Sequence, residues 1–170
     1  MDKKLIFFLS LLFSINVFSQ NIPQVPEVVT LDKIRLKINE YARNEIQIEV
    51  DALHANRKYF NAIIDKINIY FPIIEEILEE ENIPTDFKYL SLQESSLIPD
   101  AVSSSNAVGF WQFKSTTAKT YGLNINNLVD ERLNVVSSTK AAAKYLKNSN
   151  FVFDNWIFTL LSYMTGLTGA

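Results

Sequence analysis

The chain has 170 residues, of which 48% are hydrophobic, and this is enough to bury the core of one domain. Its formal net charge of −3 argues against nucleic acid as a partner. The lack of cysteine excludes a disulfide framework and a thiol-linked lipid, and a single histidine, His54, cannot assemble a zinc site or a histidine-dependent triad. We therefore expect no metal and no other cofactor.

Residues 1–19 have the pattern of a signal peptide. A charged start at residues 2–4 precedes an apolar run from Leu5 to Phe18, and Ser19 supplies a small residue at the cleavage position. A membrane-spanning helix needs about twenty apolar residues, which is longer than this run. We therefore expect cleavage and export to the periplasm or cell envelope, without stable membrane insertion afterwards.

Residues 20–59 are predicted to be a linker and a helical lead-in. From Thr30 to Glu81 the pattern is helical, and apolar residues recur at helical spacing: Leu53, Phe60, Ile63, Ile64, Ile67 and Phe71. Because proline is tolerated in the first turn of a helix, Pro72 predicts that a new helix begins there. The glutamates of residues 75–81 are interpreted as a solvated helix face rather than as metal ligands.

Glu94 occurs in the middle of an apolar stripe. The steps of three and four residues are those of one helix face: Phe87, Leu90, Glu94 and Leu97. A carboxyl group in such a stripe is partly buried, and burial disfavours its ionised form, which leaves a proton donor near neutral pH. This is the profile of a general acid. The alternative is that the helix ends near Leu92 and that Glu94 lies in solvent.

An aromatic loop follows Glu94. Pro99 and the serine-rich run after it end the helix, and Gly109 permits a tight turn or a close approach to a ligand. Trp111 and Phe113 flank Gln112, so an extended or turn segment would point the amide to one side and the aromatic rings to the other. An aromatic wall beside an amide suits a sugar-binding groove.

Three helices are predicted after this loop, each with a capping or terminating residue. Their expected bounds are Ser115 to Tyr121 with Gly122 as its end, Ser137 or Ser138 to Leu146, and a last helix capped by Asp154 and ended by Gly166.

Together these motifs resemble the catalytic core of the lytic transglycosylases, in particular their membrane-bound type D branch. The matching pieces are Glu94-Ser95, Pro99-Asp100-Ala101-Val102-Ser103, Gly109-Phe110-Trp111-Gln112-Phe113, Asp130-Glu131-Arg132, Ser138 to Leu146, and Asn155-Trp156 to Gly166. Several blocks in the right order are a far stronger signal than one motif. The resemblance covers roughly residues 60–170, which we predict to be the catalytic domain. It implies an all-α, lysozyme-like helical domain with room for one small β-hairpin near Gly109.

The resemblance also implies the substrate and the catalytic residue. Glu94 would protonate the bond between N-acetylmuramic acid and N-acetylglucosamine in peptidoglycan glycan strands, with the substrate's acetamido group assisting. The sugar's own 6-hydroxyl would then attack C1 and leave a 1,6-anhydro end, so one carboxylate suffices where a typical glycosidase needs two. The residues implied to bind substrate are Ser95, Ser103, Gln112, Phe113, Tyr145 and Tyr163, of which Tyr163 touches the acid. From the residues alone, Ser103 and Phe113 suit a loop cap and a core position equally well.

The sequence departs from the family pattern at three places. Asn106 stands where glycine is usual, Lys114-Ser115 where Met-Pro is usual, and Met164 where asparagine contacts the sugar. The thioether of Met164 accepts hydrogen bonds only weakly. Family members continue past the last motif, often with wall-binding modules, so a chain truncated at Ala170 is one interpretation. Two alternative functions stay open: a hydrolytic muramidase of goose-lysozyme type and a non-catalytic peptidoglycan-binding module.

Overall fold

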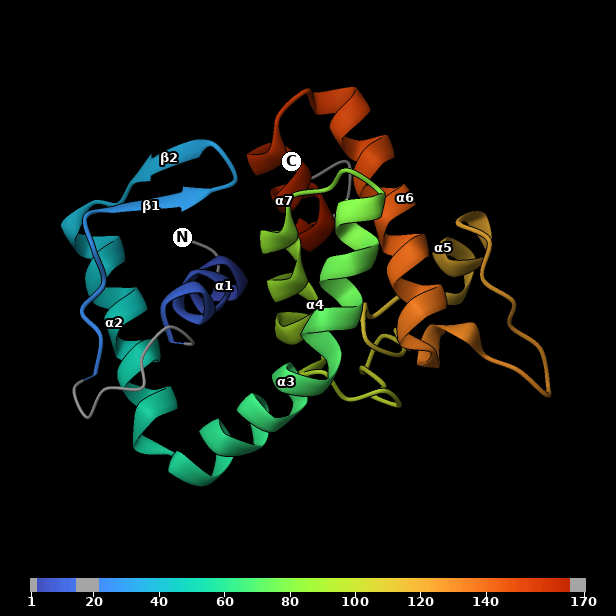
Figure 1. Cartoon of the computed structure of the whole chain (residues 1–170), viewed down its shortest axis with the longest axis horizontal. Coiled ribbons are helices and arrows are strands. Elements are labelled where there is room, and N and C mark those ends of the chain that lie inside the picture. The colour runs from blue at the N-terminus through green and yellow to red at the C-terminus, as the bar shows by residue number, and fades with distance from the viewer. Residues whose placement is uncertain (1–2, 15–21, 166–170) are drawn as a thin grey trace. The chain divides into compact units, whose positions relative to one another are not determined.

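The computed structural model describes residues 3–14 and 22–165, and the chain divides into two compact units, Met1–Lys66 and Ile67–Ala170. The predicted all-α class is confirmed, because helices dominate the described residues and their named strands form one two-stranded sheet (Figure 1). The domain bounds taken from the sequence, 1–19, 20–59 and 60–170, stay predictions.

The first unit is built from two helices and a hairpin. Helix α1 (Lys3–Ser14) contacts α2 (Glu40–Ala55). Strand β1 (Val28–Leu31) pairs antiparallel with β2 (Ile34–Lys37). Helix α1 lies within the predicted signal peptide, whose predicted cleavage position falls outside the described residues. Among the described residues, no helix is both long enough and apolar enough to cross a membrane.

The prediction of a helical pattern throughout residues 30–81 is wrong at its start, where β1 and β2 lie. The β-branched residues of β1 and β2 favour strands, and Asp32 makes the turn between them with a left-handed φ of 52°. Asn39 then caps α2, since its Oδ1 accepts a hydrogen bond of 2.8 Å from the Ala42 amide. Helix α2 ends at Ala55, and the single residue Asn56 separates it from the last helix of this stretch, α3 (Arg57–Glu80).

Pro72 lies inside α3, so the prediction that a helix begins there is also wrong. A proline in a helix interior removes one backbone hydrogen bond and crowds the preceding turn. The apolar stripe of α3 nevertheless continues through this point, with Ile67, Phe71, Ile74 and Leu78 all buried. Burying each large side chain contributes about 1.5–3 kcal/mol, so the stripe outweighs the defect.

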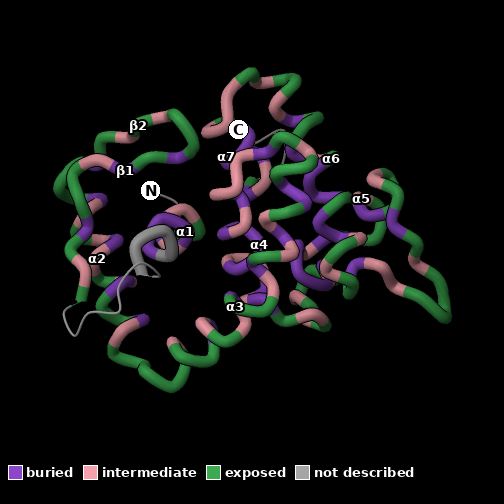
Figure 2. The backbone as a smooth tube through the Cα atoms, in the orientation of Figure 1, coloured by how far each residue is buried: buried purple, intermediate pink, exposed green. Residues whose placement is uncertain are grey.

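The second unit surrounds helix α4 (Lys88–Ser95), which a short 3-10 turn, η1 (Thr85–Phe87), precedes. Five of the eight residues of α4 are buried, so this helix lies in the interior (Figure 2). An ion pair between Lys88 and Glu75 joins α4 to α3, and the Lys88 ammonium lies 5.4 Å from the ring centroid of Phe71. The remaining elements are α5 (Ser115–Thr120), η2 (Glu131–Leu133), α6 (Val135–Phe153) and α7 (Trp156–Thr165).

The predicted short helix from Ser115 is confirmed, and Gly122 follows its end with a φ of +91°. The cap predicted at Ser137 or Ser138 is wrong: α6 starts earlier, with Asn134 Oδ1 accepting from the Ser137 amide at 2.9 Å. Helix α6 also runs to Phe153, well past the predicted end at Leu146.

The cap predicted for the last helix is wrong as well. Asp154 ends α6 in a left-handed conformation, with a φ of 46°. The next residue, Asn155, caps α7 by accepting a hydrogen bond of 2.8 Å from the Ile157 amide. An asparagine oxygen serves as a helix cap as well as an aspartate does, so the two neighbours were indistinguishable by residue type. Gly166, the predicted end of α7, lies outside the described residues.

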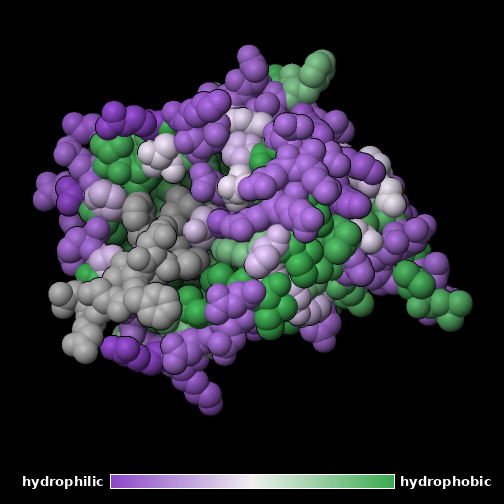
Figure 3. Space-filling view, in the orientation of Figure 1, coloured by the Kyte–Doolittle hydropathy of each residue, from purple (hydrophilic) through white to green (hydrophobic). Residues whose placement is uncertain are grey.

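We expect Leu90→Ala to destabilise the protein by about 2–5 kcal/mol, because the substitution leaves a cavity in a well-packed core. Leu90 is 0% exposed on α4. The matched control is Leu128→Ala: Leu128 is 94% exposed in the loop before η2, whose hydrophobic tip is visible at the right of Figure 3. Urea unfolding should show a change within about 0.5 kcal/mol for the control. Equal costs for the two variants would contradict the assignment of α4 to the interior.

Candidate active site

Glu94 lies in the last turn of α4, which extends three residues past Leu92. The helix stops because Ser96 and Leu97 adopt left-handed conformations, with φ values of 51° and 54°. The other members of the predicted stripe, Phe87, Leu90 and Leu97, are completely buried, whereas Glu94 is half-exposed. The carboxyl group therefore stands at the edge of the core, where one side faces packed side chains and the other is accessible.

Ser95, the neighbour of Glu94, joins α4 to the aromatic loop. Its hydroxyl oxygen lies 3.0 Å from the carbonyl oxygens of both Ser91 and Phe110, and the side chain is buried. The hydroxyl group is therefore already bonded within the protein. These bonds tie α4 to the aromatic loop beside Glu94, and the predicted contact of Ser95 with substrate stays a prediction.

Trp111 anchors the aromatic loop to two further helices. Its indole Nε1 donates a hydrogen bond of 2.9 Å to Thr139 Oγ1 on α6. Its carbonyl oxygen accepts a hydrogen bond of 2.7 Å from the Tyr163 hydroxyl on α7. The ring is fully buried, so Trp111 belongs to the core instead of forming the exposed wall of a groove. The sequence expectation of an open aromatic surface at this position is therefore wrong.

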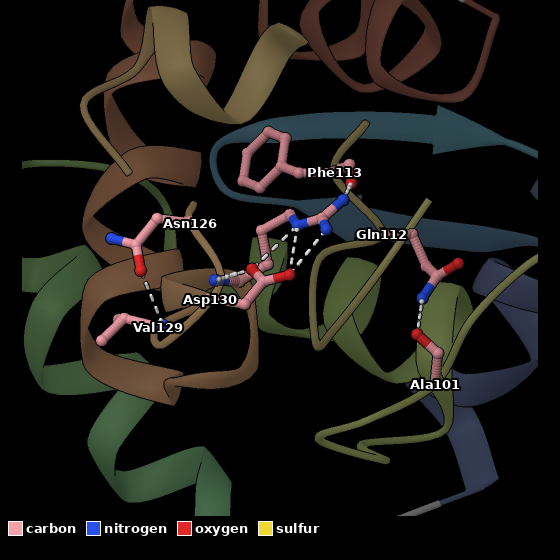
Figure 4. Close-up of polar contacts among 7 residues, drawn as sticks. Ala101, Gln112, Phe113, Asn126, Val129 and Asp130 are labelled. Carbon is pink, nitrogen blue, oxygen red and sulfur yellow. Dashed lines mark hydrogen bonds and ion pairs between the residues drawn. The ribbon is translucent and has the colours of Figure 1, made fainter. Parts of the chain in front are cut away.

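Arg132 is a third residue that anchors the aromatic loop, and the sequence analysis named it only as part of a motif. The guanidinium is buried and donates from Nη1 to the Phe113 carbonyl at 3.1 Å. Its Nε and Nη2 donate to the Asp130 carboxylate at 2.9 and 2.6 Å (Figure 4). The hydrogen bonds from Arg132 hold the pKa of Asp130 below its usual value, against the smaller opposing effect of burial. A buried charge needs such a partner, and Asp130 provides it.

Gly109 fits closely against the same arginine. Its φ is +84°, and a Cβ added there would lie 2.0 Å from the Arg132 carbonyl oxygen. Gln112 is also left-handed, with a φ of 49°, and its Nε2 donates to the carbonyl oxygens of Ala101 (3.1 Å) and Gly109 (3.0 Å). Figure 4 shows the Gln112 amide nitrogen turned toward Ala101 and its oxygen turned away. The amide thus closes the loop on one side.

The β structure described near Gly109 consists of isolated antiparallel bridges, Val102 with Val108 and Val108 with Phe113. The one two-stranded sheet of the described residues, β1 and β2, lies in the first unit. The tight turn around Gly109 and the left-handed Gln112 leave too few extended residues for longer strands.

Ser103 and Phe113 have clear structural contacts. Ser103 Oγ accepts from the Ala107 amide at 3.0 Å, and the Ser103 amide donates to the Ala107 carbonyl at 2.9 Å, so this residue closes the serine-rich tip. Phe113 is buried, and its ring centroid lies 6.4 Å from that of Tyr163. Both positions match the loop cap and the core residue that the sequence left open. Their contact with substrate stays a prediction.

A row of three tyrosines runs from the neighbourhood of Glu94 to the end of α5. The ring centroids of Tyr163 and Tyr145 are 5.2 Å apart, and those of Tyr145 and Tyr121 are 5.3 Å apart. Burial, then the negative charge of Glu94, then Tyr145 raise the pKa of Tyr163 well above its usual value. The Tyr163 hydroxyl is therefore protonated well into the alkaline range, and it donates a hydrogen bond to the Trp111 carbonyl. Sequence reasoning missed Tyr121, whose only signal was an aromatic residue before the helix-ending Gly122.

Met164, which replaces the family's asparagine, is buried on α7. The thioether therefore packs in the core of the second unit, where an amide would require hydrogen-bond partners. Among the described residues, no group of three or more histidine, aspartate and glutamate side chains is placed to hold a metal ion.

Residues 71–169 match the family described as "Transglycosylase SLT domain". The chain is 30% identical over 136 residues to "Membrane-bound lytic murein transglycosylase D" of Escherichia coli K12, and to the protein of the same name in strain O6:H1, in each case over 79% of this chain and 30% of the relative. It is 28% identical over 99 residues to a "Putative tributyltin chloride resistance protein" of an Alteromonas species, over 58% of this chain and 47% of the relative. The chain thus spans less than half the length of these relatives. The family match includes Glu94, the aromatic loop and Tyr163.

We expect Gly109→Ala to destabilise the protein far more than Gly122→Ala does. Both glycines have a positive φ, which costs another residue roughly 1–2 kcal/mol. At Gly122 the nearest atom to an added Cβ is the flexible Lys144 Nζ at 3.9 Å, whereas at Gly109 it is a backbone oxygen at 2.0 Å. Thermal unfolding should therefore show a small decrease in the unfolding temperature for Gly122→Ala and a much larger decrease for Gly109→Ala. Similar losses would mean that the Gly109–Arg132 contact is not tight.

We expect the ion pair of Asp130 and Arg132 to make stability depend on pH in acid. Because the folded pKa of Asp130 is lowered from 3.8, its contribution is complete above that value and is lost as the pH falls through the folded pKa. Asp130→Asn should cost about 1–3 kcal/mol near neutral pH, as expected when hydrogen bonds to a charged group are weakened. Urea unfolding between about pH 2 and pH 7 should show that the free energies of unfolding of the wild type and of Asp130→Asn become equal in acid. A constant difference across this range would argue against the pair.

Proposed function

The chain belongs to the family of transglycosylase SLT domains, and from this membership we propose that it is a lytic transglycosylase of peptidoglycan. The proposed substrate is the β-1,4 bond between N-acetylmuramic acid and N-acetylglucosamine in the glycan strand. The observation that carries the proposal is the position of Glu94, half-buried at the end of a buried helix and close enough to the half-buried Tyr163 for its charge to raise the pKa of that hydroxyl.

Glu94 is proposed to act first as an acid and then as a base. It protonates the glycosidic oxygen as the bond breaks, and the substrate's acetamido group stabilises the positive charge that develops at C1. The carboxylate then takes the proton of the sugar's own 6-hydroxyl, which attacks C1 and closes a 1,6-anhydro ring. No water enters the product, so the reaction is a lyase reaction.

Two groups of the matched motifs are consistent with a mechanism that uses one carboxylate. The Asp130 carboxylate is already bonded to the buried Arg132 and is therefore occupied by a structural role. Tyr163 is a neutral hydroxyl at neutral pH, and its raised pKa extends that state to more alkaline conditions, so it adds no negative charge beside Glu94. A reaction in which the substrate supplies the second group fits this arrangement better than one that needs two free carboxylates.

The other proposed site residues fall into two groups by their contacts. The amide oxygen of Gln112 points away from the loop that its nitrogen closes, so it is proposed to accept a hydrogen bond from the sugar (Figure 4). Tyr145 and Tyr163 are proposed to border the bound strand as parts of the tyrosine row. Ser95, Ser103 and Phe113 are proposed to act through the shape of the loop, because each is engaged in contacts within the protein.

The place of action is proposed from the sequence. A signal peptide over residues 1–19 would bring the chain to the periplasm or cell envelope, where peptidoglycan is found. The two Escherichia coli relatives are named as membrane-bound murein transglycosylases, which is consistent with a role in the envelope.

We expect Glu94→Gln to bind glycan strands but to lose turnover by about 10²- to 10⁴-fold or more. The amide keeps the shape of the side chain but can neither give nor take the proton. Mass spectrometry of digested peptidoglycan measures both rate and product. The wild type should release muropeptides lighter by one water than hydrolysed ones. Asp100→Asn is the matched control, since Asp100 is an exposed carboxylate of the following loop, and it should retain activity.

The products also separate the alternatives. Release of reducing ends only would replace the transglycosylase by a goose-type muramidase. Binding without any turnover by the wild type would identify a glycan-binding module. Full activity of Glu94→Gln would remove Glu94 from the reaction altogether.

A further inference from the structure

The tyrosine row continues past the residues assigned so far and ends beside a cation. Its last member, Tyr121, is half-exposed at the end of α5, and Gly122 after it is exposed. The Nζ of Lys144 lies 3.9 Å from the point that a Gly122 Cβ would occupy. Lys144 precedes Tyr145 on α6, so the ammonium group and the tyrosine row are fixed by one helix.

Lys144 differs from the next lysine of α6. Lys147 forms an ion pair with Glu81, and the hydrogen bond it donates is the main reason that the pKa of Glu81 is lowered. Lys144 affects Glu81 only through its charge at longer range, and more weakly than Lys147 does. Among the described residues, Lys144 belongs to none of the ion pairs. Its side chain is exposed, so the ammonium group is available to an anion.

The glycine keeps this position open. Because Gly122 has a φ of +91°, a residue with a side chain is strained there, and without a Cβ the backbone leaves the Lys144 ammonium uncovered. A ligand that follows the tyrosine row outward from Glu94 therefore meets an aromatic ring, a bare backbone turn and a positive charge in succession.

We propose that Lys144, together with Tyr121 and Gly122, forms an outer site that binds a carboxylate of the peptide stem attached to the glycan strand. This inference rests on the proposed function, since it assumes that the strand occupies the site at Glu94. Sugar rings and the methyl groups of a stem pack on aromatic faces, and the free carboxylates of stem peptides pair with an ammonium group. The site would make the enzyme prefer strands that carry peptides over bare strands.

The test compares two ligands on a chain that binds without turnover. Glu94→Gln protein is titrated with soluble glycan strands that carry stem peptides, and with the same strands after an amidase has removed the peptides and left one lactyl carboxylate on each muramic acid, so that the two ligands differ by the stem and its own carboxylates. We expect tighter binding of the peptide-bearing strands at low salt, and a preference that shrinks as salt is raised, because an exposed ion pair is screened. Adding Lys144→Gln should weaken binding of the peptide-bearing strands by about 2- to 5-fold, the range for an exposed pair. It should leave binding of the bare strands unchanged.

Two further variants assign the effect to Lys144. Lys147→Gln also removes one positive charge from α6, but Lys147 is paired with Glu81. This variant should keep the preference for peptide-bearing strands. Lys144→Arg keeps a cation and should restore most of it. Equal affinity for the two ligands, or the same loss with Lys147→Gln, would overturn the outer site while leaving the proposed function in place. Failure to bind either ligand, together with a wild type that has no activity on peptidoglycan, would overturn both.

Discussion

The buried guanidinium of Arg132 is the constraint on which the candidate site depends. A charge inside a protein is stable only with well-placed partners, and this one divides its donors between the Asp130 carboxylate and the Phe113 carbonyl. It thereby links the chain before α6 to the end of the aromatic loop, while its own backbone carbonyl packs against Gly109. The loop has little freedom left once these contacts form. Three further hydrogen bonds then hold the loop against α4, α6 and α7, and they involve Ser95, Trp111 and Tyr163.

The parts of the fold that depend on local periodicity were predictable from the sequence. The stripe around Leu90 and the short helix from Ser115 were found because spacing and a following glycine are local signals. Two kinds of feature could not be predicted from the sequence. The helix through Pro72 persists because its buried stripe outweighs a local defect, which only tertiary packing reveals. The caps at Asn134 and Asn155 had equally suitable residues within four positions, so residue type alone did not choose between them.

In the candidate site, too, some features were predictable from the sequence and others were not. Glu94 stood out because a carboxylate broke an apolar pattern, and the order of the motifs drew attention to Gln112 and Tyr163. The orientation of these side chains did not follow from the sequence. Trp111 was expected to form a wall and is instead buried, because its indole nitrogen finds a partner on α6. The proximity of Tyr121, Gly122 and Lys144 joins two helices and carries no signal in either one alone.

The anchors of the aromatic loop also bear on the order in which the chain folds. The partners of its bonds are separated along the sequence by 15 residues for Ser95 and Phe110, 28 for Trp111 and Thr139, and 52 for Trp111 and Tyr163. Contacts between distant segments form late, since the entropy of closing the intervening loop must first be overcome. During synthesis, the last bond waits for α7 to leave the ribosome. The geometry around Glu94 is thus completed only after α7 has docked, so a nascent chain without α7 lacks the Tyr163 bond that fixes the aromatic loop.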